Sequence, residues 1–313
     1  MAGGLPAFVP GQFITLVVRH IRRSFSISSY PPDLSITVKR KPNGEISRYL
    51  LDHIQIGDTL NALPPAGRFT FAPQTAAQRD IGFIAAGSGI SPILPLIRQA
   101  LDGEPLSHVW LLYQNHSEAD IIFARFLEEL AARHLGRFTL LHFLSAPNSH
   151  EILPSRLNNG NLEQLVPGLL RFAPSEALFF VCGPEALMRM ARFTLRVMGF
   201  GPDQFRQEHF TVDVMPPAPI LSDDSPKTVT LRHGGKTETF TVAYPVNILQ
   251  AALDHHIHLP YSCKGGRCSS CAVRCLSGQV VMSINDVLTE KDLRDGWVLT
   301  CTGYAGTDLE LEV

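Results

Sequence analysis

Four of the six cysteines form one pattern near the C-terminal end of the chain. Cys263, Cys268 and Cys271 have the spacing C-x4-C-x2-C, and Cys301 stands further along the chain. Four thiolates with this spacing are typical ligands of a [2Fe-2S] cluster. Glycines and serines separate the first three cysteines, so the loop can curl until its sulfur atoms converge. The pattern predicts a [2Fe-2S] cluster held by these four residues.

Zinc and disulfides are the alternatives for these cysteines. Structural zinc usually takes its ligands as two C-x2-C or Cys/His pairs, whereas this chain has one such pair and two isolated cysteines. A disulfide framework is typical of short secreted domains, and this chain has 313 residues. We interpret His255, His256 and His258 as surface or helix-end residues, because four cysteines already complete the ligand set.

Composition narrows the class of protein. Hydrophobic residues make up 45% of the chain, charged residues 18%, and the formal net charge is -2, so no basic surplus indicates nucleic-acid binding. The length indicates two or three domains. The longest uncharged run, 81–97, is short for a membrane span, and the first residues lack the pattern of a secretory signal. We therefore expect a cytoplasmic protein without a membrane or nucleic-acid partner.

Short strands with turn residues between them fill the N-terminal part. Strands are expected at 12–19, 23–28, 35–40 and 67–71, which is typical of a small antiparallel β-barrel. The second strand carries the run Arg23-Ser-Phe-Ser26, and Gly44-Glu-Ile-Ser47 follows. Arginine can donate bidentately to a pyrophosphate, an aromatic ring can stack on a ring system, and serine hydroxyls can bind ring edges and phosphate oxygens.

From residue 80 onward, strands alternate with helices, which predicts a doubly wound parallel sheet. The run Gly87-Ser-Gly-Ile-Ser-Pro92 lies between a strand and a helix, where phosphate can meet backbone N–H groups and the helix dipole. It differs from the Rossmann G-x-G-x-x-G motif. Cys182-Gly183-Pro184 opens the last helix. Expected strands are 109–113, 138–144 and 177–181, and expected helices run to Leu101 and over 118–134 and 185–198.

A run rich in proline and small polar residues, 215–226, predicts an extended linker. Beyond it, strands at 228–232 and 237–242 flank Gly234-Gly235, which is a hairpin signal. A helix at 247–255, the cysteine loop and a terminal strand at 308–313 fit a β-grasp fold.

Together these motifs resemble the ferredoxin-NADP reductase family joined to a plant-type ferredoxin, an order similar to that of reductase components of multicomponent oxygenases. The likeness is greatest to phenylacetyl-CoA epoxidase reductases, which share Lys264-Gly-Gly, Met282-x-x-Asn285-x-x-Leu288 and Gly296-Trp-Val-Leu-Thr-Cys301. The resemblance implies an FAD-binding barrel at 1–76, an NAD(P)-binding domain at 77–210, a linker at 211–226 and a [2Fe-2S] domain at 227–313. Such relatives carry further residues before the strand at Pro10, so an incomplete barrel or a misassigned start is expected.

The resemblance also implies roles for individual residues. Ser91, Cys182 and Glu208 are expected at the reacting centre. Residues expected to hold FAD are Arg23, Ser24, Phe25, Ser26, Lys39, Gly44, Ile46, Ser47 and Phe210. Residues expected to hold NAD(P)H are Gly87, Ser88, Gly89, Ile90, Ser91, Pro92, Asn115, His116, Cys182, Gly183 and Pro184.

The implied function is transfer of electrons from NAD(P)H through FAD to the cluster and on to a partner oxygenase or epoxidase. The choice of nicotinamide stays open, because His116 stands where relatives that prefer NADPH often carry arginine, and Glu118 would disfavour an added phosphate. A second hypothesis is an electron carrier or redox-sensing module with an impaired flavin site. The visible spectrum separates the two, because only the reductase would show flavin bands.

Overall fold

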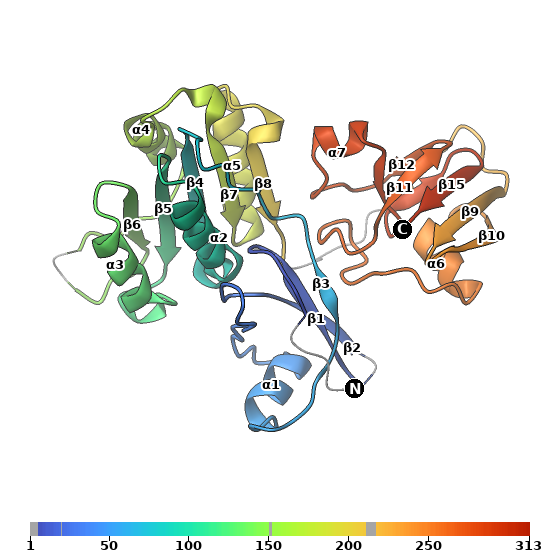
Figure 1. The fold of residues 1–313 in the computed structure, drawn as a ribbon, viewed down its shortest axis with the longest axis horizontal. Helices are drawn as coiled ribbons and strands as arrows, with labels where there is room; N and C mark the ends of the chain where they lie inside the picture. Colours follow the sequence, from blue (N-terminus) through green and yellow to red (C-terminus); the bar gives the residue numbers. More distant parts are fainter. Residues whose placement is uncertain (1–5, 20, 150–151, 211–216) are drawn as a thin grey trace. The chain divides into compact units, whose positions relative to one another are not determined.

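The computed structural model describes residues 6–19, 21–149, 152–210 and 217–313. These residues form two compact units (Figure 1). The first unit comprises the chain up to Pro65 together with Phe69–Glu208, and the second comprises His209–Val313 together with Ala66–Arg68. Part of the expected linker, 211–216, lies outside the described residues.

The N-terminal part of the first unit is a three-stranded sheet with one helix. The strands β1 (Phe13–Val18), β2 (Ile21–Ser26) and β3 (Asn61–Ala66) are ordered β2-β1-β3, and β1 pairs antiparallel with β2. The helix α1 (Glu45–Asp52) begins within the G-x-x-S run and was not predicted. Two prolines in β3 fit its place at the edge of the sheet, where a missing N–H costs no ladder bond.

Two of the expected strands in this part were wrong. At 35–40 the chain makes only an isolated bridge, between Ile36 and Ile27. At 67–71 it forms no strand, because Phe69 and Phe71 instead pack on Phe180, with ring centroids 5.5 Å apart in both pairs. Alternating aromatic residues here serve packing against another layer rather than a strand ladder.

The rest of the first unit is a five-stranded parallel sheet. Its strands are β4 (Asp80–Ala86), β5 (His108–Asn115), β6 (Phe138–Leu144), β7 (Leu178–Cys182) and β8 (Phe205–Glu208), in the order β6-β5-β4-β7-β8. The prediction of a doubly wound sheet is confirmed. Near-continuous apolar strands fit this arrangement, since both faces are covered.

Helices cover the two faces of this sheet in pairs. Helices α2 (Ile90–Gly103) and α3 (Ala124–Arg133) contribute to the apolar cluster on one face, and α4 (Asn159–Leu169) and α5 (Glu185–Val197) to that on the other. The helix expected at 118–134 is split into a short 3-10 turn and α3. The break coincides with Phe123, whose φ of 62° lies in the left-handed region.

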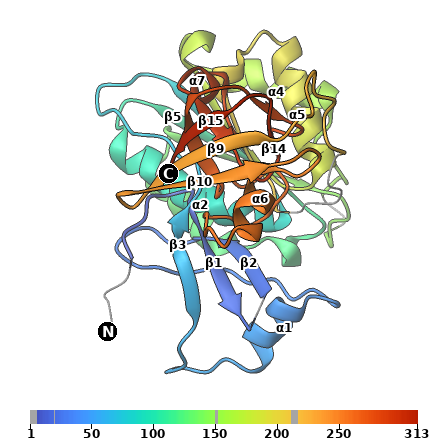
Figure 2. The same cartoon turned by 90° about the vertical axis from the view of Figure 1, so that its right-hand side faces the viewer.

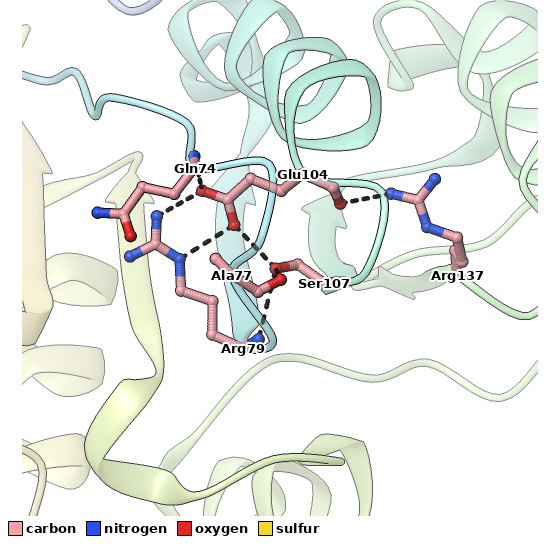
Figure 3. A network of polar contacts seen from close by, with 6 residues as sticks. All are labelled: Gln74, Ala77, Arg79, Glu104, Ser107 and Arg137. Carbon is pink, nitrogen blue, oxygen red and sulfur yellow. Dashed lines mark hydrogen bonds and ion pairs between the residues drawn. The ribbon is translucent and has the colours of Figure 1, made fainter.

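A buried polar network fixes the end of α2 (Figure 3). The carboxylate of Glu104, which is fully buried, accepts hydrogen bonds from Arg79 Nε at 3.0 Å, Ser107 Oγ at 2.8 Å and Gln74 N at 3.1 Å. The backbone oxygen of Glu104 accepts a further bond from Arg137 Nη2 at 2.8 Å. The network thus joins the segment before β4, which carries Gln74 and Arg79, to the end of α2, the helix that follows β4.

The second unit is a mixed β-sheet with two short helices (Figure 2). The five-stranded sheet has the order β10-β9-β15-β11-β13, in which β9 and β15 are parallel and the other neighbouring pairs are antiparallel. Its strands are β9 (Lys227–His233), β10 (Lys236–Val242), β11 (Ala272–Ser277), β13 (Trp297–Leu299) and β15 (Leu309–Glu312). A second pair is β12 (Val280–Met282) with β14 (Gly303–Ala305), and the helices are α6 (Ile248–Asp254) and α7 (Glu290–Arg294).

The hairpin predicted between β9 and β10 is confirmed. Lys236 pairs with His233, and Gly234 and Gly235 between them have φ values of 54° and 76°. Two consecutive positive φ values are typical of a type I′ turn, which glycine adopts without steric cost.

Candidate functional site

The first candidate site lies where the strand order of the parallel sheet reverses, at the carboxyl ends of β4 and β7. Two glycine-containing turns meet there. A Cβ atom built on Gly89 would lie 2.0 Å from the carbonyl oxygen of Cys182, and one built on Gly183 would lie 3.2 Å from Ala86 N. Open α/β sheets bind ligands at such switch points. The close approach of the two turns therefore leaves no room for a Cβ atom at Gly89 and little room for one at Gly183.

The N-terminus of α2 opens at this switch point. Helix α2 begins at Ile90, directly after the 3-10 turn Gly87–Gly89, and Ser91 is buried in its first turn. Tyr113 in β5 donates from its hydroxyl to the carbonyl oxygen of Gly87 at 3.0 Å. Burial raises the pKa of Tyr113 to about 12, so the phenol keeps its proton and remains a donor. Backbone N–H groups at such a helix end are suited to a phosphate.

Three residues expected at the reacting centre or the flavin meet beside this turn. Ser26 Oγ, on β2, donates to Glu208 Oε2 at 2.7 Å. In the pairing of β7 with β8, Glu208 is the partner of Cys182. Burial raises the pKa of Glu208 to about 7, and burial together with the nearby Glu208 raises the pKa of the Cys182 thiol well above its usual value. Cys182 is therefore a neutral thiol, suited to shaping a pocket rather than to nucleophilic attack.

The side chains of the Arg23-Ser-Phe-Ser26 run in β2 face both sides of the sheet. Side chains alternate along a strand, so Ser24 and Ser26 face one side, and Ser24 Oγ lies 2.9 Å from Thr15 Oγ1. Arg23 and Phe25 face the other side, where Arg23 is exposed and Phe25 is half-buried. A cationic fork and an aromatic ring are thus accessible to a ligand, as a flavin site requires.

The G-x-x-S run forms the beginning of α1. Gly44 is its N-cap, Ile46 is buried, and Ser47 Oγ donates to Gly44 O at 3.1 Å and accepts from Lys41 N at 3.2 Å. A Cβ on Gly44 would lie 2.5 Å from Ser47 Oγ, which explains the glycine. Lys39 lies on the exposed chain before this helix.

Phe210 is the least enclosed of the apolar residues assigned to the flavin, with 37% of its surface exposed. It follows Glu208 and His209 at the beginning of the second unit. Its assignment to the flavin stays a proposal.

The carboxyl end of β5 carries the residues assigned to nicotinamide choice. Asn115 is buried, and both polar atoms of its amide lack a hydrogen-bond partner in the described part of the chain. Such an amide is suited to a polar ligand. His116 is exposed, and its Nδ1 lies 3.2 Å from Ser145 Oγ. Glu118 accepts from Asn148 N at 2.7 Å, and this bond lowers the pKa of the carboxyl group, so a fixed negative charge lies near His116 in the sequence.

The second candidate site is the cysteine loop, where the four thiols lie in two pairs. A hydrogen bond from the Cys268 thiol lowers the pKa of Cys263 to about 6, and the same bond raises the pKa of Cys268. Cys271 Sγ lies 3.2 Å from Cys301 Sγ, which raises the pKa of Cys271 and lowers that of Cys301. Two thiolates for each of two irons is the ligand set of a [2Fe-2S] cluster.

A single metal ion fits this arrangement less well. Within the described ranges, no group of three or more His, Cys, Asp or Glu side chains is placed to hold one ion. A tetrahedral zinc site would need four ligands around one centre, whereas these thiols form two separate pairs.

Backbone donors surround the thiols as a cluster requires. Gly265 N donates to Cys263 Sγ at 3.3 Å, and Gly266 N donates to Cys301 Sγ at 3.4 Å. Gly266 and Ser269 have φ values of 71° and 54°, so the loop passes through the left-handed region at both positions. Ser269 Oγ is buried with no partner in the described structure, so an acceptor such as a cluster sulfide would satisfy it.

Two features of these sites were missed from the sequence. The sequence carries a weak signal for the hydrogen bond between Tyr113 and Gly87, because a tyrosine in a buried strand needs a partner for its hydroxyl. The bond between Ser26 and Glu208 has none, because it joins residues 182 positions apart.

Comparisons with known proteins find matches for the two regions of the chain that carry the candidate sites. Residues 83–192 match the oxidoreductase NAD-binding domain, and residues 231–306 match the 2Fe-2S iron-sulfur cluster binding domain. The chain is 35% identical to the ferredoxin reductase component of 3-ketosteroid-9-alpha-monooxygenase from Mycobacterium tuberculosis, over 96% of this chain and 84% of that protein. It is 34% identical to a component of 1,2-phenylacetyl-CoA epoxidase from Escherichia coli, over 94% of this chain and 85% of that protein.

The solved structure of phthalate dioxygenase reductase shares the fold. Its TM-score is 0.55 at 22% identity, over 99% of this chain and 90% of that one, and it is described as a modular structure for electron transfer from pyridine nucleotides to [2Fe-2S]. The expected fold class, a flavin and nucleotide module with a [2Fe-2S] module, is confirmed. The chain belongs to the family of ferredoxin reductase components of oxygenases, which pass electrons from NAD(P)H to a [2Fe-2S] centre.

Proposed function

We propose that this chain supplies electrons from NAD(P)H to a terminal oxygenase or epoxidase that acts on a phenylacetyl-CoA-like aromatic substrate. The observation that carries the reductase part is the meeting of Ser26, Glu208 and Cys182 at the switch point, in a chain that also holds two thiol pairs. The aromatic substrate rests on the resemblance to the epoxidase component.

A steroid monooxygenase is the second candidate partner, since identity to its reductase component is 35%, against 34% for the epoxidase component. Reconstitution decides between them. The purified chain is mixed with NADH and each terminal oxygenase in turn, and product formation is compared at equal protein concentrations. Turnover with the epoxidase alone supports the proposal, and turnover with the steroid enzyme alone contradicts it.

We infer that the chain divides into an FAD-binding part at 1–76, a nucleotide-binding part at 77–210, a linker at 211–226 and a cluster-binding part at 227–313. When bound, FAD accepts two electrons from NAD(P)H together and releases them singly, as a [2Fe-2S] centre requires. The accessible Arg23 and Phe25 and the first turn of α1 are suited to hold it.

Glu208 and Ser26 are proposed to hold a proton beside the reacting groups. With a pKa of about 7, Glu208 is present in both protonation states near neutral pH, and Ser26 donates to its carboxylate. Cys182 is fully buried and the two glycine turns approach closely, so we infer that these residues shape the site and keep water out of it. Orientation in a dry pocket is the main contribution a protein makes to such a transfer.

The visible spectrum of the purified protein tests the proposal. Flavin and cluster bands that bleach together on addition of NADH are expected for the reductase. Cluster bands alone, with no NADH response, would instead support the electron-carrier or redox-sensing module.

We propose a cytoplasmic location, which cell fractionation tests. No helix among the described residues is long and apolar enough to span a bilayer. The proposed location rests on the four cysteines of the cluster site, because a reducing compartment keeps their thiols from forming disulfides.

A further inference from the structure

The loop 283–289, which we name the strap, contacts the segment that carries Cys301. Ser283 N donates to Thr302 O at 2.9 Å, and Thr302 Oγ1 donates to Ile284 O at 2.9 Å. Since Thr302 directly follows a cluster ligand, the beginning of the strap is fixed to one of the two ligand-bearing segments.

The middle of the strap contacts the other ligand-bearing segment, the loop between Cys263 and Cys268. Asp286 N donates to Gly266 O at 3.2 Å, and the Asp286 carboxylate lies 3.1 Å from Arg267 Nε. A Cβ on Gly266 would lie 2.8 Å from Ile284 O, so the two loops are in close contact. The strap therefore links both ligand-bearing segments of the cluster site.

Asn285 holds the strap in this shape. Its Oδ1 accepts from Leu288 N at 2.8 Å and from Val287 N at 3.3 Å, and its Nδ2 donates to Leu288 O at 3.0 Å. Leu288 is buried in the core of the second unit. The oxygen and the nitrogen of the Asn285 amide thus both form hydrogen bonds that close the turn. The methyl group of an alanine in its place could form none of these bonds.

The strap lies against a hydrogen bond that spans the two segments, from Gly266 N to Cys301 Sγ at 3.4 Å. Reduction adds negative charge to a cluster and its sulfurs, so N–H donors stabilise the reduced form and raise the potential. We propose that Asn285 is a positioning residue that sets the reduction potential of the cluster, by holding the strap against Gly266. The inference rests on the cluster site described above.

The test compares two asparagine variants of the full-length holoprotein. Asn285→Ala removes the strap bonds, whereas Asn247→Ala removes a similar bond in the same unit, from Gln250 N to Asn247 Oδ1 at 2.8 Å. We expect the equilibrium constant for cluster reduction to fall about tenfold in Asn285→Ala, which corresponds to about 59 mV for one electron. The potential of Asn247→Ala should match that of the wild type. Spectroelectrochemical titration gives the potentials, and electron paramagnetic resonance of the reduced protein reports the geometry.

The outcomes separate a positioning role from a structural one. An unchanged potential in an Asn285→Ala protein that keeps two irons and two sulfides overturns the proposal, and so does an equal shift in Asn247→Ala. If Asn285→Ala loses its cluster during purification, Asn285→Ser decides, because a serine hydroxyl can still accept one strap bond and should give an intermediate potential. A wild-type protein without two irons and two sulfides would refute the cluster site instead.

Discussion

Replacing Glu208 by glutamine removes a buried charge and should change how stability depends on pH. Burial raises the pKa of Glu208 from 4.5 to about 7. The folded protein therefore binds a proton that the unfolded chain releases between these values, so stability is lost as pH rises through this window. At ~1.4 kcal/mol for each pH unit, the loss reaches about 3 kcal/mol above pH 7.

Glutamine keeps an oxygen that can accept from Ser26 Oγ but does not ionise. We expect Glu208→Gln to show little of this loss, so that its stability relative to the wild type rises by up to about 3 kcal/mol between pH 5 and pH 8. Urea unfolding is followed by the fluorescence of Trp110, which is buried in the first unit. A Trp297→Phe background leaves Trp110 as the single tryptophan, since the chain has two.

A second variant sharpens the same test. The bond from Ser26 lowers the pKa of Glu208, so Ser26→Ala should raise that pKa and enlarge the pH dependence. Identical pH profiles for the wild type and Glu208→Gln would show that Glu208 does not titrate in this window, and the proposed proton site would be wrong.

Three further predictions concern the electron path, the nicotinamide and the sheet. We expect Cys301→Ser to reduce NADH-dependent cytochrome c reduction at least tenfold while ferricyanide reduction persists, because Cys301 lies in the second unit and the residues proposed to bind NADH lie in the first. Parallel loss of both activities with FAD still bound contradicts the path. The wild type should use NADH at least as well as NADPH, and a hundredfold preference for NADPH in steady-state kinetics contradicts this prediction. The variant His116→Arg should shift kcat/KM towards NADPH. Glu104→Ala should destabilise the first unit by about 3 kcal/mol, since it leaves Arg79 without its buried partner. If urea unfolding gives Glu104→Ala the same stability as the wild type, the network in Figure 3 is dispensable.

The sequence predicted a helix or strand well where the residues of that element alone determine its hydrophobic pattern. The strand expected at 138–144 is observed over Phe138–Leu144, because leucine and phenylalanine fill most of its positions, as expected of a strand in a parallel sheet. The aromatic residues at Phe69 and Phe71 misled the same reasoning. Their alternation is that of a strand, but their partner is a ring of another sheet, which no local pattern reveals.

The helix α1 was missed for a related reason. Gly44 and Ser47 were interpreted through the ligand they would hold, whereas the structure shows that the same residues also begin a helix. A glycine N-cap gives a weak start signal, and a helix of this length shows few turns of apolar periodicity.

Site residues divide in the same way, into those that act through local spacing and those that act through tertiary contact. The cysteine spacing specifies a cluster because three of its ligands share one short loop. The bonds of Asn285 to Val287 and Leu288 are local, but nothing local shows that the turn they close lies against Gly266, or that Ser26 reaches Glu208. In the functions proposed above, both contacts lie beside groups that change charge: the strap beside the cluster ligands, and Ser26 beside Glu208. A shared motif such as Met282-x-x-Asn285-x-x-Leu288 does not reveal such contacts, so differences among relatives with the same four cysteines should be sought in them.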